Sequence, residues 1–220
     1  LKGIAVILVV YRHVLIGVQR TGLAVPEYLE RANMMFYSFR MPLFFILSGL
    51  FISAGLDKRK YQSLIKIKIQ TLLLPYLIWV FIQVTLQIIF SAYTNSSRTL
   101  VDYTYIFYQP RNLDQFWYLP ALFNVTLIYI LVKHFLKTPG KWQLLIGITL
   151  YFISPYFNKI SMISDWMEFY VFFALGDCIK DFVVKKEYEK KFSSVWFLLT
   201  VLPFLLQFNY ITFTGVSYFL

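Results

Sequence analysis

The sequence predicts an all-α integral membrane protein, a polytopic bundle of helices. Of its 220 residues, 59% are hydrophobic, 20% are aromatic and only 15% are charged, and the mean hydropathy is +0.62. Average soluble domains are about 45–50% apolar and about 25% charged. Because so large an apolar surplus cannot be buried in one soluble core of this size, lipid is expected to supply the missing interior, and membrane lipids are predicted partners.

Seven apolar segments are the predicted spans of this fragment. A spanning helix needs about 20 mostly apolar residues, and the segments lie at about 1–18, 34–56, 71–92, 116–135, 142–157, 166–184 and from about 194 onward. The sixth carries Glu168, Asp177 and Lys180. No internal repeat or second domain is found, so residues 1–220 are predicted to form a single membrane-embedded domain. Because the chain starts and stops inside apolar sequence, it is expected to be truncated at both ends.

The Lys and Arg residues between these segments predict the orientation. Loops rich in them alternate with poorer ones, and cytoplasmic loops are the richer. The rich loops follow the second, fourth and sixth segments and contain Lys58, Arg59, Lys60, Lys66, Lys68, Lys133, Lys137, Lys141, Lys185, Lys186, Lys190 and Lys191. This pattern places the chain start on the cytoplasmic side of a multi-pass protein in the cell (inner or plasma) membrane.

Charge and composition also exclude several classes of partner. The formal net charge of +10 is divided among short loops and forms no single patch, so nucleic acid is not a predicted partner. The lone cysteine, Cys178, cannot form an internal disulfide. The two histidines, His13 and His134, lie far apart in sequence, and no His, Cys and carboxylate cluster has metal-ligand spacing. Neither a metal nor a bound cofactor is predicted.

The first apolar segment combines a cation with a deeply placed imidazole. Lys2 lies eleven residues before His13, and eleven helical steps of about 100° return to within about 20° of the same direction. The two residues therefore share one helix face. Imidazole suits general-base chemistry near neutral pH, although a histidine hydrogen-bonded between helices is the structural alternative. Arg12, beside His13, cannot share this face.

The second segment carries another charge at membrane depth. Charged groups there cost at least about 2.5–3.5 kcal/mol each, so they face a protein interior or a cavity. Arg40 is such a group, and Pro42 follows two residues later. The pair Ser48-Gly49 is typical of close helix packing. After this segment, residues 61–69 mix cations with aliphatic side chains, which suits either an amphipathic interfacial helix or the mouth of a site for a phosphorylated ligand.

Four motifs in order carry a resemblance to a known family. They are Lys2-Gly3-Ile4-Ala5 leading to His13, then Met41-Pro42-Leu43-Phe44-Phe45-Ile46-Leu47-Ser48-Gly49, then Leu74-Pro75-Tyr76, then Phe116-Trp117-Tyr118-Leu119-Pro120-Ala121-Leu122-Phe123. With these motifs the chain resembles the acyltransferase 3 family of bacterial membrane O-acyltransferases, and within it the branch related to fucose 4-O-acetylases. Arg12 and Arg40 depart from the residues usual at their positions.

The resemblance implies transfer of an acyl group, usually acetyl from acetyl-CoA as co-substrate, to a hydroxyl of a cell-surface or exported saccharide. His13 matches the essential histidine of the family, and Lys2 stands where the family often has arginine. In the mechanism that we predict, His13 is the general base and Arg40 stabilises the oxyanion or orients the sugar. The acyl-CoA phosphates are then bound by four basic residues, Lys2, Lys58, Arg59 and Lys60.

An aromatic pair is the predicted binding site for the acceptor. Trp117 and Tyr118 are candidates for stacking on a saccharide or a lipid-linked saccharide, with an interfacial aromatic anchor as the alternative. A transporter or flippase of a lipid-linked saccharide is the main rival function, because intramembrane charges and broken helices also occur in that class. The Lys2 and His13 pair distinguishes the two, since a flippase does not require it.

Overall fold

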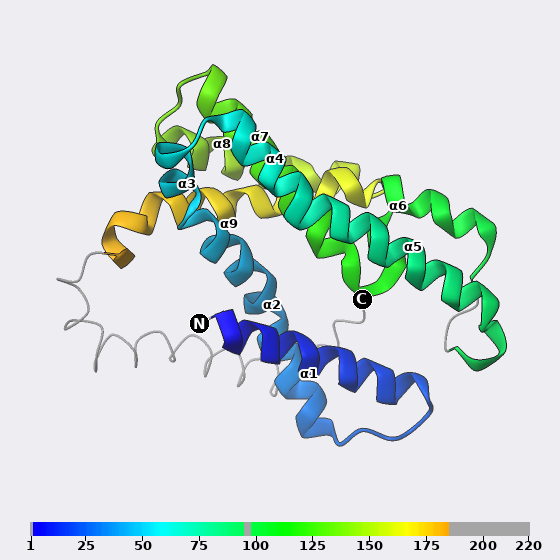
Figure 1. The fold of residues 1–220 in the computed structure, drawn as a ribbon. Coiled ribbons are helices and arrows are strands. Elements are labelled where there is room, and N and C mark those ends of the chain that lie inside the picture. The colour runs from blue at the N-terminus through cyan, green and yellow to red at the C-terminus, as the bar shows by residue number, and fades with distance from the viewer. Residues whose placement is uncertain (1, 95–97, 185–220) are drawn as a thin grey trace. The chain divides into compact units, whose positions relative to one another are not determined.

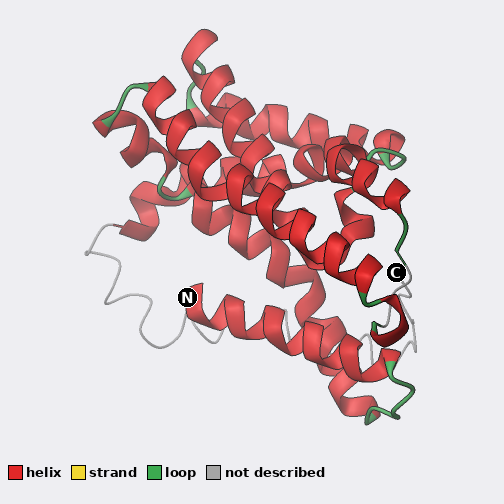
Figure 2. Cartoon of the chain, turned by 45° about the vertical axis from the view of Figure 1, so that its right-hand side comes forward, coloured by secondary structure: helices red, strands yellow, loops and turns green. Residues whose placement is uncertain are grey.

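The computed structural model describes residues 2–94 and 98–184, and every regular element in these ranges is helical (Figures 1 and 2). The α-helices are α1 (Lys2–Arg20), α2 (Glu27–Gly49), α3 (Ile52–Lys58), α4 (Tyr61–Lys68), α5 (Leu74–Ile89), α6 (Tyr105–Tyr108), α7 (Tyr118–Phe135), α8 (Gly140–Ile153) and α9 (Ser161–Val184). A π-helical turn, Ile69–Leu73, and four 3₁₀ segments connect them: Ser91–Tyr93, Leu100–Thr104, Pro110–Trp117 and Ser154–Phe157. The predicted all-α class is confirmed.

The chain forms two compact units. The first unit contains Leu1–Phe44 and Ile179–Leu220, and the second unit contains Phe45–Cys178. Helices α2 and α9 contribute residues to both. The expectation of one domain stays a prediction, and the two units are described separately below.

Three stretches in the described residues are long and apolar enough to cross a membrane. They are Arg40–Lys58, Tyr61–Ile89 and Pro110–Phe135, and they correspond to the second, third and fourth predicted segments. Helices α1, α8 and α9 occupy the first, fifth and sixth segments but are not among the three. Helix α8 has 14 residues, or about 21 Å at 1.5 Å per residue. The seventh segment lies outside the described residues, so seven spans remain a prediction.

The second of these stretches is one continuous helical path, α4 to α5, in Figure 1. The sequence suggested a separate segment at 61–69, but a π turn joins it to α5. Pro75 lies at the start of α5. A proline lacks the N–H for an α-helical hydrogen bond, and its ring collides with the carbonyl four residues earlier. The wider π turn gives the helix room to continue at this point.

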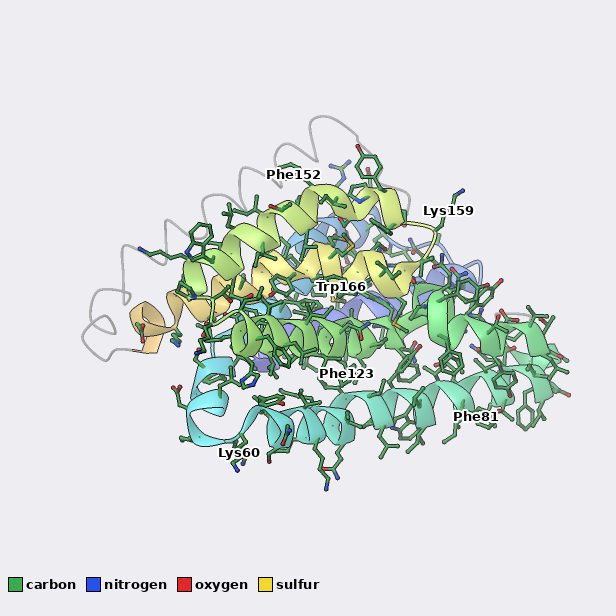
Figure 3. The ribbon with its side chains drawn as sticks, turned by 90° about the horizontal axis from the view of Figure 1, so that it is seen from above. Lys60, Phe81, Phe123, Phe152, Lys159 and Trp166 are labelled. Carbon is green, nitrogen blue, oxygen red and sulfur yellow. The ribbon has the colours of Figure 1, made fainter. Side chains whose placement is uncertain are left out.

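Helix α5 buries one face and exposes the other. Tyr76, Val80 and Val84 are buried, and the Tyr76 hydroxyl donates a hydrogen bond to the Ile106 carbonyl at 2.7 Å. Phe81, labelled in Figure 3, is 58% exposed. Large apolar groups facing outward on a helix of this hydropathy fit contact with lipid.

Three glycines let helices of the second unit approach closely. A Cβ on Gly49 would collide with the Phe173 carbonyl oxygen of α9, and one on Gly176 would collide with the Ile46 carbonyl oxygen. On α8, a Cβ on Gly147 would lie 2.7 Å from the Val171 Cα. Small residues at such crossings are the usual basis of helix association in membranes. The close-packing role predicted for Gly49 is therefore confirmed.

Candidate functional site

His13 lies on α1, in the first unit. Lys2 and His13 belong to the same helix, so the shared face predicted from their spacing follows from the backbone; the Lys2 side chain lies outside the described atoms. His13 is exposed, and its Nδ1 is 2.8 Å from the Val9 carbonyl oxygen. Because a carbonyl oxygen can only accept, Nδ1 carries the proton in this hydrogen bond, and Nε2 of the neutral ring keeps its lone pair. A general base requires this arrangement.

Arg40, on α2 of the same unit, is the least exposed charged residue in the part of the chain that the structure describes. Only 1% of the residue is exposed, and Nη2 donates to Asn33 Oδ1 at 3.0 Å. Asn33 lies seven residues earlier on α2, two helical turns away, and sequence reasoning did not identify it as a partner. A buried guanidinium needs such acceptors because its desolvation is costly. The described hydrogen bond of His13 is with its own helix rather than with Arg40.

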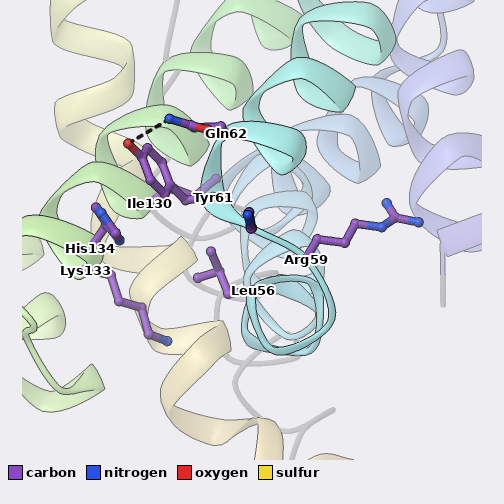
Figure 4. Close-up of a pocket in the computed structure, with 8 residues that line it drawn as sticks. Leu56, Arg59, Tyr61, Gln62, Ile130, Lys133 and His134 are labelled. Atoms are coloured by element: carbon purple, nitrogen blue, oxygen red, sulfur yellow. Dashed lines mark hydrogen bonds between the residues drawn. The ribbon is translucent and has the colours of Figure 1, made fainter.

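The second unit contains a cavity of about 500 Å³ between α3, α4 and α7 (Figure 4). Eight residues line it: Leu56, Arg59, Lys60, Tyr61, Gln62, Ile130, Lys133 and His134. These eight include three permanent cations and a histidine but no carboxylate. They stand where two candidate spans end and a third begins, so we expect the cavity to lie near a membrane surface. The orientation predicted from loop charges would make this the cytoplasmic surface, which stays a prediction.

Two of the four residues predicted to bind the donor line this cavity. They are Arg59 and Lys60, whereas Lys58 ends α3 as an exposed residue outside the lining. Sequence reasoning missed Lys133 and His134, although both stand in the last turn of a predicted span. The His134 ring stacks on Tyr61, with 3.9 Å between ring centroids. A strongly basic cavity of this size is suited to binding part of a nucleotide, namely its phosphates and its base.

The predicted aromatic pair lies at the other end of α7, also in the second unit. Tyr118 points into the helix packing, because its ring contacts Phe45 edge-on at 5.4 Å. The Arg111 guanidinium lies over the Trp117 ring, 4.7 Å from its centroid. Arg111 also pairs with two carboxylates of α9, Asp165 at 2.6 Å and Glu168 at 3.4 Å.

This second cluster, Arg111, Trp117, Asp165 and Glu168, differs in character from the cavity. Asp165 is buried, whereas the side chains of Arg111 and Glu168 are both 40% exposed. A planar guanidinium over an aromatic ring, together with carboxylates, supplies a flat face, donors and acceptors for a polar ligand. Glu168 was recognised in the sequence only as a charge of the sixth apolar segment, because its partner 57 residues away could not be read from spacing.

An ion-pair network orders the loop that leads to this cluster. Arg98 pairs with Asp102 at 3.4 Å and with Asp114 at 3.0 Å. Burial alone would raise the pKa of Asp102, but hydrogen bonds from the Thr99 backbone and hydroxyl and the charge of Arg98 outweigh it and lower that pKa. The Asp102 carboxylate is therefore charged at neutral pH and caps the 3₁₀ turn that begins after Thr99.

A model of a known protein family, described as an acyltransferase domain, matches residues 1–220. The chain belongs to this acyltransferase 3 family. Membership makes it a membrane acyltransferase, which requires an acyl donor and an acceptor, and it favours acyl transfer over transport. No curated protein and no solved structure gives a significant match.

The predicted site residues of this acyltransferase belong to two different units. His13, Lys2 and Arg40 belong to the first unit, and Arg59, Lys60, Trp117 and Tyr118 to the second. Within the described ranges no three His, Cys, Asp or Glu side chains could hold a metal ion. The absence of a metal or cofactor in the protein itself stays a prediction.

Proposed function

We propose that this acyltransferase transfers an acyl group, in the simplest case acetyl, from acyl-CoA to a hydroxyl of a saccharide. The family supplies the reaction class. The catalytic part rests on one observation, the His13 Nδ1 to Val9 carbonyl hydrogen bond, which leaves Nε2 as a base. A multi-pass location in the inner or plasma membrane and a relationship to the fucose 4-O-acetylase branch belong to the same proposal.

The donor is bound through its phosphates. Arg59 and Lys60 line the basic cavity at one membrane surface, and Lys58 is their neighbour in sequence. Lys2 adds a further cation at the start of α1. Acyl-CoA carries several phosphate charges on one molecule, so it matches a cavity lined by cations and no carboxylate better than a neutral metabolite does.

The chemical step is a direct transfer. His13 Nε2 takes the proton of the acceptor hydroxyl as its oxygen bonds to the thioester carbonyl carbon. The carbonyl oxygen becomes an oxyanion, which the Arg40 guanidinium stabilises. The C–S bond then breaks, and the CoA sulfur leaves with the proton returned by the imidazolium. The products are an O-acyl ester and free CoA, so no further reactant is needed.

The acceptor is bound near the opposite end of α7 from the basic cavity. Trp117 and Tyr118 belong to this end, and Arg111 joins them as the group that covers the indole. Planar guanidinium donors fit neighbouring sugar hydroxyls, and the half-exposed Glu168 offers acceptors. Donor and acceptor on different membrane faces would suit a saccharide that is modified during or after export.

The experiment is radiolabelled acetyl transfer by the full-length protein in membranes. The proposal predicts label in a saccharide fraction that mild alkali removes, because O-esters are alkali-labile and amides are not, together with an equal amount of free CoA. Labelled acetyl-CoA that is neither consumed nor transferred, in membranes with verified folded protein, would contradict it.

A further inference from the structure

A buried carboxylate of α9 gathers hydrogen-bond donors from two other helices. Asp177 is 4% exposed. Its Oδ2 accepts from the Tyr129 hydroxyl at 2.6 Å and from Lys133 Nζ at 3.0 Å, both on α7, and its Oδ1 accepts from the Ser53 hydroxyl of α3. A charge removed from water needs this many partners, since leaving one unpaired is strongly destabilising.

Lys133 links this buried cluster to the basic cavity. Its ammonium donates to Asp177 and, at 2.7 Å, to Ser53 Oγ, while the side chain remains 26% exposed and lines the cavity. In Figure 4, His134 lies toward Tyr61 and Lys133 extends away from that ring pair. An ammonium has three N–H donors. The two hydrogen bonds to the protein leave one donor for a ligand.

We propose that Lys133 binds a phosphate of the acyl-CoA donor, and that Asp177, supported by Ser53 and Tyr129, is the positioning residue that holds it at the cavity wall. This inference rests on the proposed function, because it assigns the donor to this cavity. A lysine side chain fixed before binding loses less conformational entropy when a phosphate arrives. Asp177 also offsets the repulsion of Lys133 by Arg59 and Lys60.

A purely structural ion pair would be enclosed by packing. Lys133 instead remains partly exposed, and it lines a cavity whose other polar residues are cationic or neutral. The position of the pair at the end of a candidate span also puts the ammonium at the membrane surface rather than at mid-depth. Both observations fit an ammonium group that binds a ligand.

The test is CoA binding by calorimetry and acetyl-transfer kinetics, using full-length protein in phosphatidylcholine nanodiscs. Lys133→Ala should raise the Kd for CoA about tenfold or more, as expected for a lost charge-assisted hydrogen bond, with kcat at saturating donor changed by less than about threefold. Asp177→Asn should shift the Kd in the same direction by a smaller factor. Lys141→Ala is the matched control, because Lys141 is an exposed cation of α8 outside the cavity lining.

Several results would overturn the inference. A structural pair predicts less folded protein and a lower kcat, with the Kd for CoA unchanged in the folded fraction. A general field effect predicts an equal loss in Lys141→Ala. If an anionic lipid headgroup occupies the site, Lys133→Ala should change the response to added phosphatidylglycerol and leave CoA affinity intact.

Folding and the proposed function are controlled separately. If Lys133→Ala does not fold, Lys133→Gln, which retains a donor for Ser53, provides the same comparison. Wild-type protein that neither binds CoA nor transfers acetyl would contradict the proposed function and the inference together. If the wild-type protein binds CoA and transfers acetyl, and Lys133→Ala has the same CoA affinity, the inference alone is contradicted.

Discussion

The guanidinium carbon of Arg111 lies 4.7 Å from the centroid of the Trp117 ring, so the indole face is already covered by a cation. A sugar approaching that face meets the guanidinium first. Arg111 keeps its orientation because Asp165, buried beneath it, accepts from its Nε at 2.6 Å. Any acceptor site at this end of α7 is therefore built around Arg111 as much as around the aromatic residue.

Arg111→Lys should accordingly weaken acceptor binding. Lysine keeps the charge beside Asp165 but loses the planar fork that pairs with neighbouring hydroxyls. We expect the KM for the saccharide acceptor to rise about tenfold, the loss of one good hydrogen bond, with the KM for acetyl-CoA unchanged. Arg31→Lys, the same change at an arginine of α2 that pairs with Glu27, is the control. Equal effects of both substitutions would place Arg111 outside the acceptor site.

Gly49→Ala should destabilise the second unit. The added methyl group would collide with the Phe173 backbone carbonyl, and backbone cannot move aside as a side chain can, so a loss of about 1–3 kcal/mol is expected. Thermal unfolding in detergent measures it. Gly55→Ala is matched, because its Cβ would meet only Leu64 methyl groups at 3.5 Å, an ordinary contact. Similar unfolding temperatures for both variants would contradict the close helix crossing.

The basic cavity predicts which neighbouring cations contribute most to binding of the acyl donor. Arg59→Ala and Lys60→Ala should each raise the KM for acetyl-CoA about three- to tenfold, since both side chains line the cavity. Lys58→Ala should have less effect, because Lys58 lies outside the lining. Steady-state kinetics at several donor concentrations separates KM from kcat. A larger effect at Lys58 than at Lys60 would show that the donor binds elsewhere.

The orientation can be tested by labelling single cysteines with an impermeant thiol reagent in intact spheroplasts, in a Cys178→Ala background. Cysteines at Lys60, Arg98 and Lys137 cover both predicted membrane faces. The alternation of loop charge predicts labelling at position 98 alone. Labelling at position 60 would place the basic cavity on the outer face, away from cytoplasmic acyl-CoA.

Features of local sequence predicted part of this structure well. Apolar run length located the three stretches that can cross a membrane, and the Ser48-Gly49 pair indicated a close helix crossing that Gly49 makes. The continuity of α4 with α5 was missed, because Lys66 and Lys68 interrupt the apolar run while the π turn keeps the helix intact.

Partners distant in sequence could not be predicted. Arg111 meets Asp165 across 54 residues, and Ser53 meets Asp177 across 124. Spacing along one helix predicts which residues share a face, as for Lys2 and His13, but pairing between helices depends on the fold. The charged residues of the predicted spans indicated a protein interior or a cavity, without identifying which residues meet there.

The most direct test of the account is the role of His13 in acyl transfer. If Nε2 is the general base, His13→Ala should insert and fold normally but transfer acetyl about 10²–10⁴-fold more slowly. His13→Gln should not restore transfer, whereas a histidine needed only for packing would lose activity in proportion to folded protein and be rescued by glutamine.

The measurement is radiolabelled acetyl transfer in membranes, normalised to folded protein, for the wild type, His13→Ala and His13→Gln. The account predicts a normal folded fraction in all three and transfer in the wild type alone. Wild-type membranes that show no acetyl transfer would support a transporter instead. Transfer by His13→Ala at the wild-type rate would contradict the mechanism.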